Sequence, residues 1–390
     1  MSLQAGSGWP RTFRALRHQP YRLYVAAQLV SLTGSWVQTT ALTWIAYAWT
    51  DTSFWPATLM AAQVVPMALF SLMGGWLADR FGRRQLILLT QSGQLLQALV
   101  LVGVVALGWR EPLVLLLVCL LLGLLNALDN PARLAFLVDL VGRDDLPNAV
   151  ALNALTFNLA RLIGPALGAV LLLLVGPVGC FAVNAFSFVP VLLVLLSLRL
   201  PNSHRSASRL PPSATLAFLL HRPRLLLLLM MAAGMAFFGW PLLSLLPALA
   251  DRRLGLGQSG CGGLLSAVGA GALVAALLVA NLSTGYGRLV ALIGGVLSAA
   301  SGLASLAWVQ SFALGLLGAA LCGLGLILFL ACGQTAIQLQ ADDHNRGQLM
   351  GLWLTVLAVA HPLGHLGAGA LADRWGVETV LGLQAVGLLG

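Results

Sequence analysis

Long apolar runs dominate this chain. A helix that crosses the hydrocarbon core of a bilayer needs about 20 mostly apolar residues. Twelve runs approach or reach that length, and a polar stretch separates the first six from the last six. Only 8% of the residues are charged and 59% are hydrophobic, whereas soluble domains have about 25% and 45–50%. These features predict an all-α integral membrane protein with twelve transmembrane helices.

The predicted spans fall into two similar halves. Those of the first half cover residues 23–49, 55–77, 86–107, 113–128, 149–175 and 178–198. Those of the second half cover residues 225–249, 260–282, 289–308, 312–337, 349–372 and 377–390. We therefore expect two six-helix bundles, residues 1–198 and 225–390, joined by a cytoplasmic linker at 199–224. The run at 377–390 makes about 21 Å of helix, so the last helix is expected to be short or truncated.

The arginines are distributed unevenly between the loops. All 21 basic residues are arginines, and the net charge is +9. If the N-terminus is cytoplasmic, 16 of them lie on the cytoplasmic side and 4 on the other, with Arg161 inside the fifth span. Such a bias predicts the cytoplasmic face. In short loops between apolar runs, these charges favour anionic lipid headgroups as partners, and no nucleic acid.

A charged turn lies between the second and third spans. It reads Gly75-Trp-Leu-Ala-Asp79-Arg80-Phe-Gly82-Arg83-Arg84. Gly75 would let two helices approach closely, and Gly82 permits backbone angles that other residues avoid. An ordinary basic turn is the alternative. A related sequence, residues 369–376, repeats the Gly, Asp and Arg spacing after the eleventh span and is expected on the opposite face.

Arg161 is the most unusual residue within the spans. It lies 12 residues into the predicted fifth span, about 18 Å from its cytoplasmic start. Asn158 shares its helix face. A charge at this depth is costly and commonly functional. The guanidinium could bind a carboxylate, catecholate or phosphate, or it could be held by amides and carbonyls of its own bundle. Both interpretations remain open.

Other polar and aromatic residues are candidates for a central cavity, although packing between helices would explain each of them equally well. His361 and His365 lie four residues apart and could carry protons, because histidine titrates near neutral pH; buried, hydrogen-bonded histidines are the alternative. This pair does not predict a metal site, because no glutamate lies beside the first histidine. The five cysteines do not predict one either, because they are scattered along the chain. The cavity candidates are Arg161, Asn158, Gln38, Trp36, Trp240, Gln334, His361 and His365.

A helix-kink motif follows Arg161. In Gly164-Pro165-Ala-Leu-Gly168, proline removes a backbone hydrogen bond and the glycines permit close packing. A kink with only a packing role is the alternative. The chain has no phosphate-binding GxxxxGK[ST] loop, no HExxH and no nucleophile elbow between a strand and a helix. We therefore expect neither an enzyme nor a cofactor.

Several stretches together resemble the major facilitator superfamily, and in combination its enterobactin-exporter-like branch, over nearly the whole chain. The turn at 75–84 and Gly164-Pro165 are typical of the superfamily. The branch is indicated by the combination of these with Ser31-Leu-Thr-Gly34-Ser-Trp36-Val-Gln38, Asp129-Asn-Pro131-Ala-Arg133, Arg143-Asp-Asp-Leu-Pro147, Asn158-Leu-Ala-Arg161 and Arg346-Gly-Gln-Leu-Met-Gly351. The resemblance implies the superfamily's fold of two pseudo-symmetric six-helix bundles.

The resemblance also implies a conformational latch at the cytoplasmic face. In the superfamily, the acid of the turn caps a helix of the other half when the transporter is open outward, and an arginine four residues later pairs with an acid of the fourth helix. Asp79 would then lie near residues 347–349, and Arg83 would pair with Asp129. The latch residues are Gly75, Asp79, Arg80, Gly82, Arg83, Arg84 and Asp129. The Gly-Pro motif resembles that of antiporters.

The resulting functional hypothesis is a monomeric secondary transporter in the bacterial inner membrane. It would export small amphiphilic anions, siderophore-like or drug-like, by alternating access, and protons are a candidate coupling ion. The alternative is a transporter of lysophospholipids on the same fold. A transport-dead receptor or scaffold is less favoured, because no large loop or tail domain is present.

Overall fold

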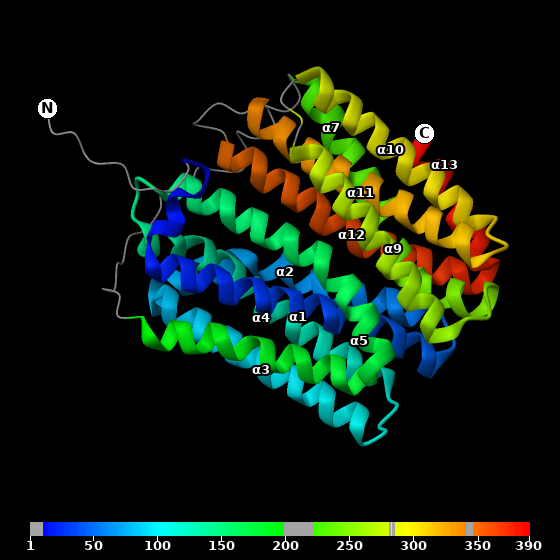
Figure 1. Ribbon diagram of the computed structural model, residues 1–390, viewed down its shortest axis with the longest axis horizontal. Helices are drawn as coiled ribbons and strands as arrows, with labels where there is room; N and C mark the ends of the chain where they lie inside the picture. Colours follow the sequence, from blue (N-terminus) through cyan, green and yellow to red (C-terminus); the bar gives the residue numbers. More distant parts are fainter. Residues whose placement is uncertain (1–10, 199–221, 281, 283–284, 341–345) are drawn as a thin grey trace, which may run out of the picture.

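The computed structural model describes residues 11–198, 222–280, 282, 285–340 and 346–390, which are helical almost throughout (Figure 1). The first half contains η1 (Arg11–Arg17), α1 (Gln19–Thr50), α2 (Phe54–Phe81), α3 (Arg83–Ala106), α4 (Pro112–Val141) and α5 (Leu146–Ser197). The second half contains α7 (Pro223–Gly234), η2 (Met235–Gly239), α8 (Leu242–Ala248), η3 (Leu249–Arg253), α9 (Gly257–Ala280), α10 (Gly285–Ala307), α11 (Phe312–Gln340), α12 (Arg346–Trp375) and α13 (Val377–Leu389).

The helices make twelve crossings. Among the described residues, nine helical segments are long and apolar enough to cross a membrane, and one of these is the run from α7 to η3. Another is α5, whose 52 residues cross twice because Gly176 (φ 67°) breaks the helical backbone. The 32-residue α1 and the 13-residue α13 complete the set, so the predicted twelve-helix fold with a short last helix is confirmed.

Successive crossings bring the helix ends to two faces. We call the face that carries η1 and the starts of α1, α5, α7 and α12 the η1 face, and the other the opposite face. Within each half, α1 packs on α5, α2 on α4, and α11 on both α9 and α10, while α2–α12 and α5–α9 contacts join the halves. In Figure 1 the blue-to-green helices α1–α5 and the green-to-red helices α7–α13 form these two bundles. The predicted linker lies almost entirely outside the described residues.

The fourth helix is longer than its apolar run. We predicted an apolar span at 113–128 that can continue through Asp129 and Asn130, and α4 continues further, to Val141. The prediction was short because the final turns carry charges, and these charges are paired: Arg133 bonds Asp129 and Arg83 bonds Asp139. Paired charges let the helix continue beyond the apolar segment.

Glycines allow the closest helix contacts in the second half. A Cβ atom on Gly323 of α11 would overlap the carbonyl oxygen of Val268 on α9, and one on Gly271 of α9 would overlap that of Ala320 on α11. Small residues are the usual means of close packing between helices in lipid, where no hydrophobic force brings helices together.

We predict that Gly323→Val destabilises the protein strongly. The added side chain has to push α9 away from α11, and overpacking of this kind costs about 1–3 kcal/mol or more. The measurement is the unfolding temperature in detergent. Gly103→Val is the matched control, because a Cβ at Gly103 on α3 meets nothing within 4 Å. Equal unfolding temperatures of the two variants would contradict this packing.

Candidate binding site

Arg161 of α5 lies among aromatic rings from both halves. The centre of its guanidinium is 5.0 Å from the ring centroid of Phe157, 5.7 Å from that of Trp36 on α1 and 5.2 Å from that of Trp240, which follows η2. The ring of His361 on α12 meets Trp240 edge-on, with centroids 5.3 Å apart. We call these five residues the Arg161 cluster. It joins four helices from the two halves.

The cluster members lie at one depth in the bundle. Arg161 and His361 are each 15 residues from the η1-face start of their helices, Leu146 and Arg346. Trp36 is 17 residues from Gln19 at the start of α1. These separations correspond to about 22–26 Å at 1.5 Å per residue. The cluster is therefore near the middle of these crossings, because α12 and the first crossing of α5, from Leu146 to the break at Gly176, are each about 30 residues long.

The guanidinium has no anionic partner. Among the residues that the structure describes, no salt bridge joins Arg161, and its Nε is buried without a hydrogen-bond acceptor. Nε2 of His361 is likewise buried and unpartnered. Cation–π contacts contribute roughly 0.5–2 kcal/mol each, but they do not supply an acceptor for the buried Nε–H. The cluster thus contains buried nitrogen atoms that could donate hydrogen bonds to an anion, and no described residue supplies that anion.

Glycine and proline shape the α1–α5 contact beside Arg161. A Cβ on Gly164 would overlap the Cβ of Trp36, and one on Gly168 would lie 3.0 Å from Thr40. Gly164 therefore lets Trp36 pack against α5 next to the guanidinium. The backbone stays helical through Pro165; within α5, all of which is described, the non-helical residue is Gly176.

The structure places the other predicted cavity residues outside the cluster. Gln38 is buried, where its amide donates to Gln97 at 3.2 Å and accepts from Asn184 at 2.7 Å. Asn158 is exposed, and Gln334 on α11 is half-buried. His365 is buried, with Nδ1 3.0 Å from the hydroxyl of Ser244 on α8. A hydrogen-bonded packing role therefore describes Gln38 and His365 in this conformation.

Hydrogen bonds join the two halves at the opposite face. Backbone N–H groups of Ser53 and Phe54, at the start of α2, donate to the carboxylate of Asp373 on α12, at 2.7 and 3.1 Å. A carboxylate at a helix N-terminus is stabilised by unpaired N–H groups and by the helix dipole. Gly369 permits the contact, because a Cβ there would lie 2.5 Å from that of Ala57. The repeated motif at 369–376 thus caps a helix of the other half.

Further polar contacts strengthen this closure. The hydroxyl of Tyr47 donates to Asp251 at 3.0 Å, and Arg252 donates to the backbone carbonyl and the carboxylate of Asp51. Gln258 on α9 donates to the carbonyl of Leu172 on α5. Every hydrogen bond or ion pair found between described residues of the two halves lies at this face. The conformation is closed there.

The pairing of the charged turn differs from the expected one. Arg83 bonds Asp139 at 2.9 Å instead of Asp129, which accepts from Arg133 at 2.8 Å and from Thr90 at 2.6 Å. Arg83 is the first residue of α3 and lies level with the last turns of α4, whereas Asp129 lies about 15 Å deeper along that helix. Gly82 has the positive φ (87°) that its position predicted.

The remaining turn residues are only partly described. Arg84 donates to the carbonyl oxygens of Leu195 and Leu196, and Arg80 lies over the ring of Trp76. The surroundings of Gly75, the side chain of Asp79 and the surroundings of residues 347–348 lie outside the described parts. The predicted Asp79 cap therefore stays a prediction.

Sequence reasoning missed several of these residues. Phe157 was not singled out, although it lies one turn before Arg161 on the same helix, where an aromatic residue can cover a guanidinium. The spacing at 369–376 did flag Asp373, but not its role. Nothing in the sequence pairs Tyr47 with Asp251 or Asp51 with Arg252, because each pair is more than 200 positions apart.

The known proteins that this chain resembles are membrane transport proteins. The family model described as "Transmembrane secretion effector", within the major facilitator superfamily, matches residues 11–390. Enterobactin exporter EntS of Shigella flexneri is 32% identical, with 82% of this chain and 78% of that protein covered. Multidrug efflux pump Tap of Mycolicibacterium fortuitum is 26% identical, over 95% and 93%.

A solved structure shares the fold. The crystal structure of nucleoside transporter NupG superimposes with a TM-score of 0.74, covering 95% of this chain and 96% of that one, at 12% identity. At that identity the similarity concerns the arrangement of the helices alone.

We predict that Asp373→Asn loosens the closure of the opposite face. An uncharged amide caps a helix more weakly, so we expect a loss of about 1–2 kcal/mol and a 5–30-fold shift toward conformations open at that face. Spin labels at the exposed positions Leu107 and Trp308, on the two halves, should report a longer distance. Glu111→Gln, on an exposed residue of the same face, is the control. An unchanged distance distribution in Asp373→Asn would contradict the assigned role.

Proposed function

This chain belongs to the major facilitator superfamily, in the branch of transmembrane secretion effectors, and we propose that it exports small amphiphilic anions across the bacterial inner membrane. Transport would occur by alternating access, with residues 1–198 and 225–390 moving as two bodies about a site between them. The Arg161 cluster lies between the two halves, where such a site is reached from either side in turn.

Arg161 carries this proposal: no salt bridge joins it to another described residue, and its Nε is buried without a hydrogen-bond acceptor among them. A buried polar group without a partner costs about 1–3 kcal/mol, and more when it is charged. A carboxylate, catecholate or phosphate would remove that cost through charge-assisted hydrogen bonds. The surrounding rings of Trp36, Phe157 and Trp240 favour a ligand with an apolar or aromatic body. An amphiphilic anion has both properties.

The orientation follows from the arginines. The positive-inside rule makes the arginine-rich η1 face cytoplasmic. The closed opposite face is then periplasmic, and the conformation is one that accepts substrate from the cytoplasm. This is the loading state that an exporter requires. Asp373 and Asp79 would alternate, with each acid capping a helix of the other half in one of the two states.

The related proteins guide the substrate class. The names of the relatives specify export of a siderophore in one case and efflux of multiple drugs in the other. A site made of one cation and several rings suits such molecules, because rings accept variable aromatic bodies while the cation selects charge. Lysophospholipids stay in the test as the alternative, because their phosphate would also suit Arg161.

The test is transport into proteoliposomes with an imposed pH gradient. The panel contains carboxyfluorescein, a catecholate siderophore, a lysophospholipid and a cationic dye of similar size. We expect anionic compounds to move and Arg161→Ala to abolish this, because loss of one partner of a buried charge pair costs about 2–5 kcal/mol, at least tenfold in affinity. Arg161→Lys should retain part of the activity.

Matched controls separate binding from folding. Arg110→Ala removes an exposed arginine and should transport normally. Arg161→Ala has to elute as a single species with an unfolding temperature near that of the wild type. If that folded variant moves every anion at the wild-type rate, the Arg161 site is refuted.

We further propose that His361 couples transport to protons. Its ring lies against Trp240, so a proton on its unpartnered Nε2 would place a second charge beside Arg161 and strengthen anion binding. We predict that His361→Gln retains downhill transport but loses its dependence on the pH gradient. His18→Gln, at the η1 face, is the control. A full pH-gradient response in His361→Gln would refute this role.

A further inference from the structure

The helix that carries Trp240 is interrupted beside the Arg161 cluster. There α7 passes into the π-helix η2, and the N–H of Trp240 donates to the carbonyl of Met235, five residues earlier, at 3.3 Å. Pro241 follows and has no N–H, so the carbonyl of Phe237 cannot receive a helical bond from residue 241. Single π-helical turns of this kind are frequent at functional sites. The backbone of this crossing therefore does not fix the ring of Trp240 by itself.

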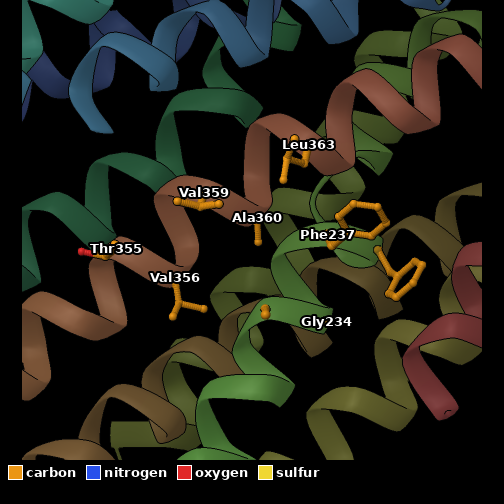
Figure 2. Close-up of a pocket in the computed structure, with 9 residues that line it drawn as sticks. Gly234, Phe237, Thr355, Val356, Val359, Ala360 and Leu363 are labelled. Carbon is orange, nitrogen blue, oxygen red and sulfur yellow. The ribbon is translucent and has the colours of Figure 1, made fainter. Parts of the chain in front are cut away.

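The interrupted segment packs directly against α12. A Cβ on Gly364 would overlap the carbonyl oxygen of Phe237, so the two backbones touch where the helix is interrupted. Figure 2 shows α12, with Ala360 and Leu363, alongside the segment that carries Gly234 and Phe237. Gly364 thus brings α12 close enough for side chains on either side of it to reach the interrupted segment.

Ser244 and His365 form a buried hydrogen-bonded pair just beyond the interruption. They are 0% and 4% exposed. The hydroxyl of Ser244 donates to the carbonyl of Pro241 at 2.7 Å, and its oxygen lies 3.0 Å from Nδ1 of His365. A hydroxyl has a single hydrogen to donate, so this oxygen accepts from His365, and the ring proton of His365 lies on Nδ1. The pair ties the residue that follows Trp240 to α12.

Trp240 is thereby held to α12 on two sides. Its ring meets the ring of His361, and the carbonyl of the next residue is tied through Ser244 to His365. All of these residues belong to the second half, whereas Arg161 belongs to the first. When the halves move apart, Trp240 therefore stays with α12, and its contact with Arg161 is the one that changes.

We propose that Ser244 and His365 are positioning residues of the binding site, whose hydrogen bonds hold the ring of Trp240 where it covers the guanidinium of Arg161. Neither residue touches the anion. Without the pair, the ring takes up several positions and the site binds its anion more weakly. The effect on transport rests on the proposed function, whereas the position of the ring can be measured without a ligand.

The first test observes the ring of Trp240 directly. Tryptophan is replaced by 5-fluorotryptophan in the purified protein, and the fluorine resonance of Trp240 is the one that Trp240→Phe lacks. We expect this resonance to broaden or shift in Ser244→Ala and in His365→Leu. His365→Asn should keep the wild-type resonance, because its side-chain amide can donate from the position of Nδ1.

A matched control removes the same kind of bond elsewhere in the second half. The hydroxyl of Ser305 on α10 donates to the carbonyl of Gly302, three residues earlier, at 2.8 Å, as that of Ser244 does to Pro241. Ser305→Ala should leave the resonance of Trp240 unchanged. If His365→Leu does not fold, Ser244→Ala, which removes only a hydroxyl, carries the test.

The second test measures carboxyfluorescein transport by the same variants. We expect Ser244→Ala to raise KM about threefold or more, at a maximal rate near that of the wild type, and this increase to disappear in a Trp240→Ala background. An unchanged Trp240 resonance in folded Ser244→Ala overturns the proposal, as does a KM increase that persists without Trp240. An altered resonance with an unchanged KM supports the positioning role and refutes the Arg161 cluster as the anion site.

Discussion

A positive charge inside the membrane, with no anion among the described residues to pair with it, is the constraint on which the site depends. A central arginine costs about 2.5–3.5 kcal/mol even on the most lenient insertion scales. Three aromatic rings offset part of this cost and fix the guanidinium between the halves. Gly164 is needed because it lets Trp36 reach α5. The close packing of α1 on α5 at Gly164 thus also places the ring of Trp36 beside the guanidinium that would bind the anion.

The same arrangement relates binding to conformation. Arg161 belongs to the first half and Trp240 to the second, so a ligand that binds the guanidinium acts on a contact between the halves. The contacts at the opposite face, led by the Asp373 cap on α2, hold the alternative access route shut. A ligand shifts such an equilibrium only by its difference in affinity for the two states. The Arg161–Trp240 contact is one place where that difference can arise.

The sequence predicts features that a single segment determines. Apolar runs specify the number of helices, Gly82 marks a turn, and Arg161 is conspicuous as a charge within a span. It does not predict contacts between distant segments, such as the one between Asp373 and α2. The resemblance to the superfamily implied Asp129 as the partner of Arg83, whereas Arg83 bonds Asp139, because the charged last turns of α4 continue to the level of Arg83. Gln38 was predicted as a cavity residue, because a polar side chain on a spanning helix looks alike in the sequence whether it faces water or a hydrogen-bonded neighbour.

The most direct test of the central claim is a structure of the protein with a transported anion bound. This account predicts the anionic group at hydrogen-bonding distance, about 3 Å, from the guanidinium of Arg161, with the ligand body between Trp36 and Trp240. Nε2 of His361 should lie near the same group. A ligand bound elsewhere in the bundle, with Arg161 still enclosed by its rings and unpaired, would contradict the account.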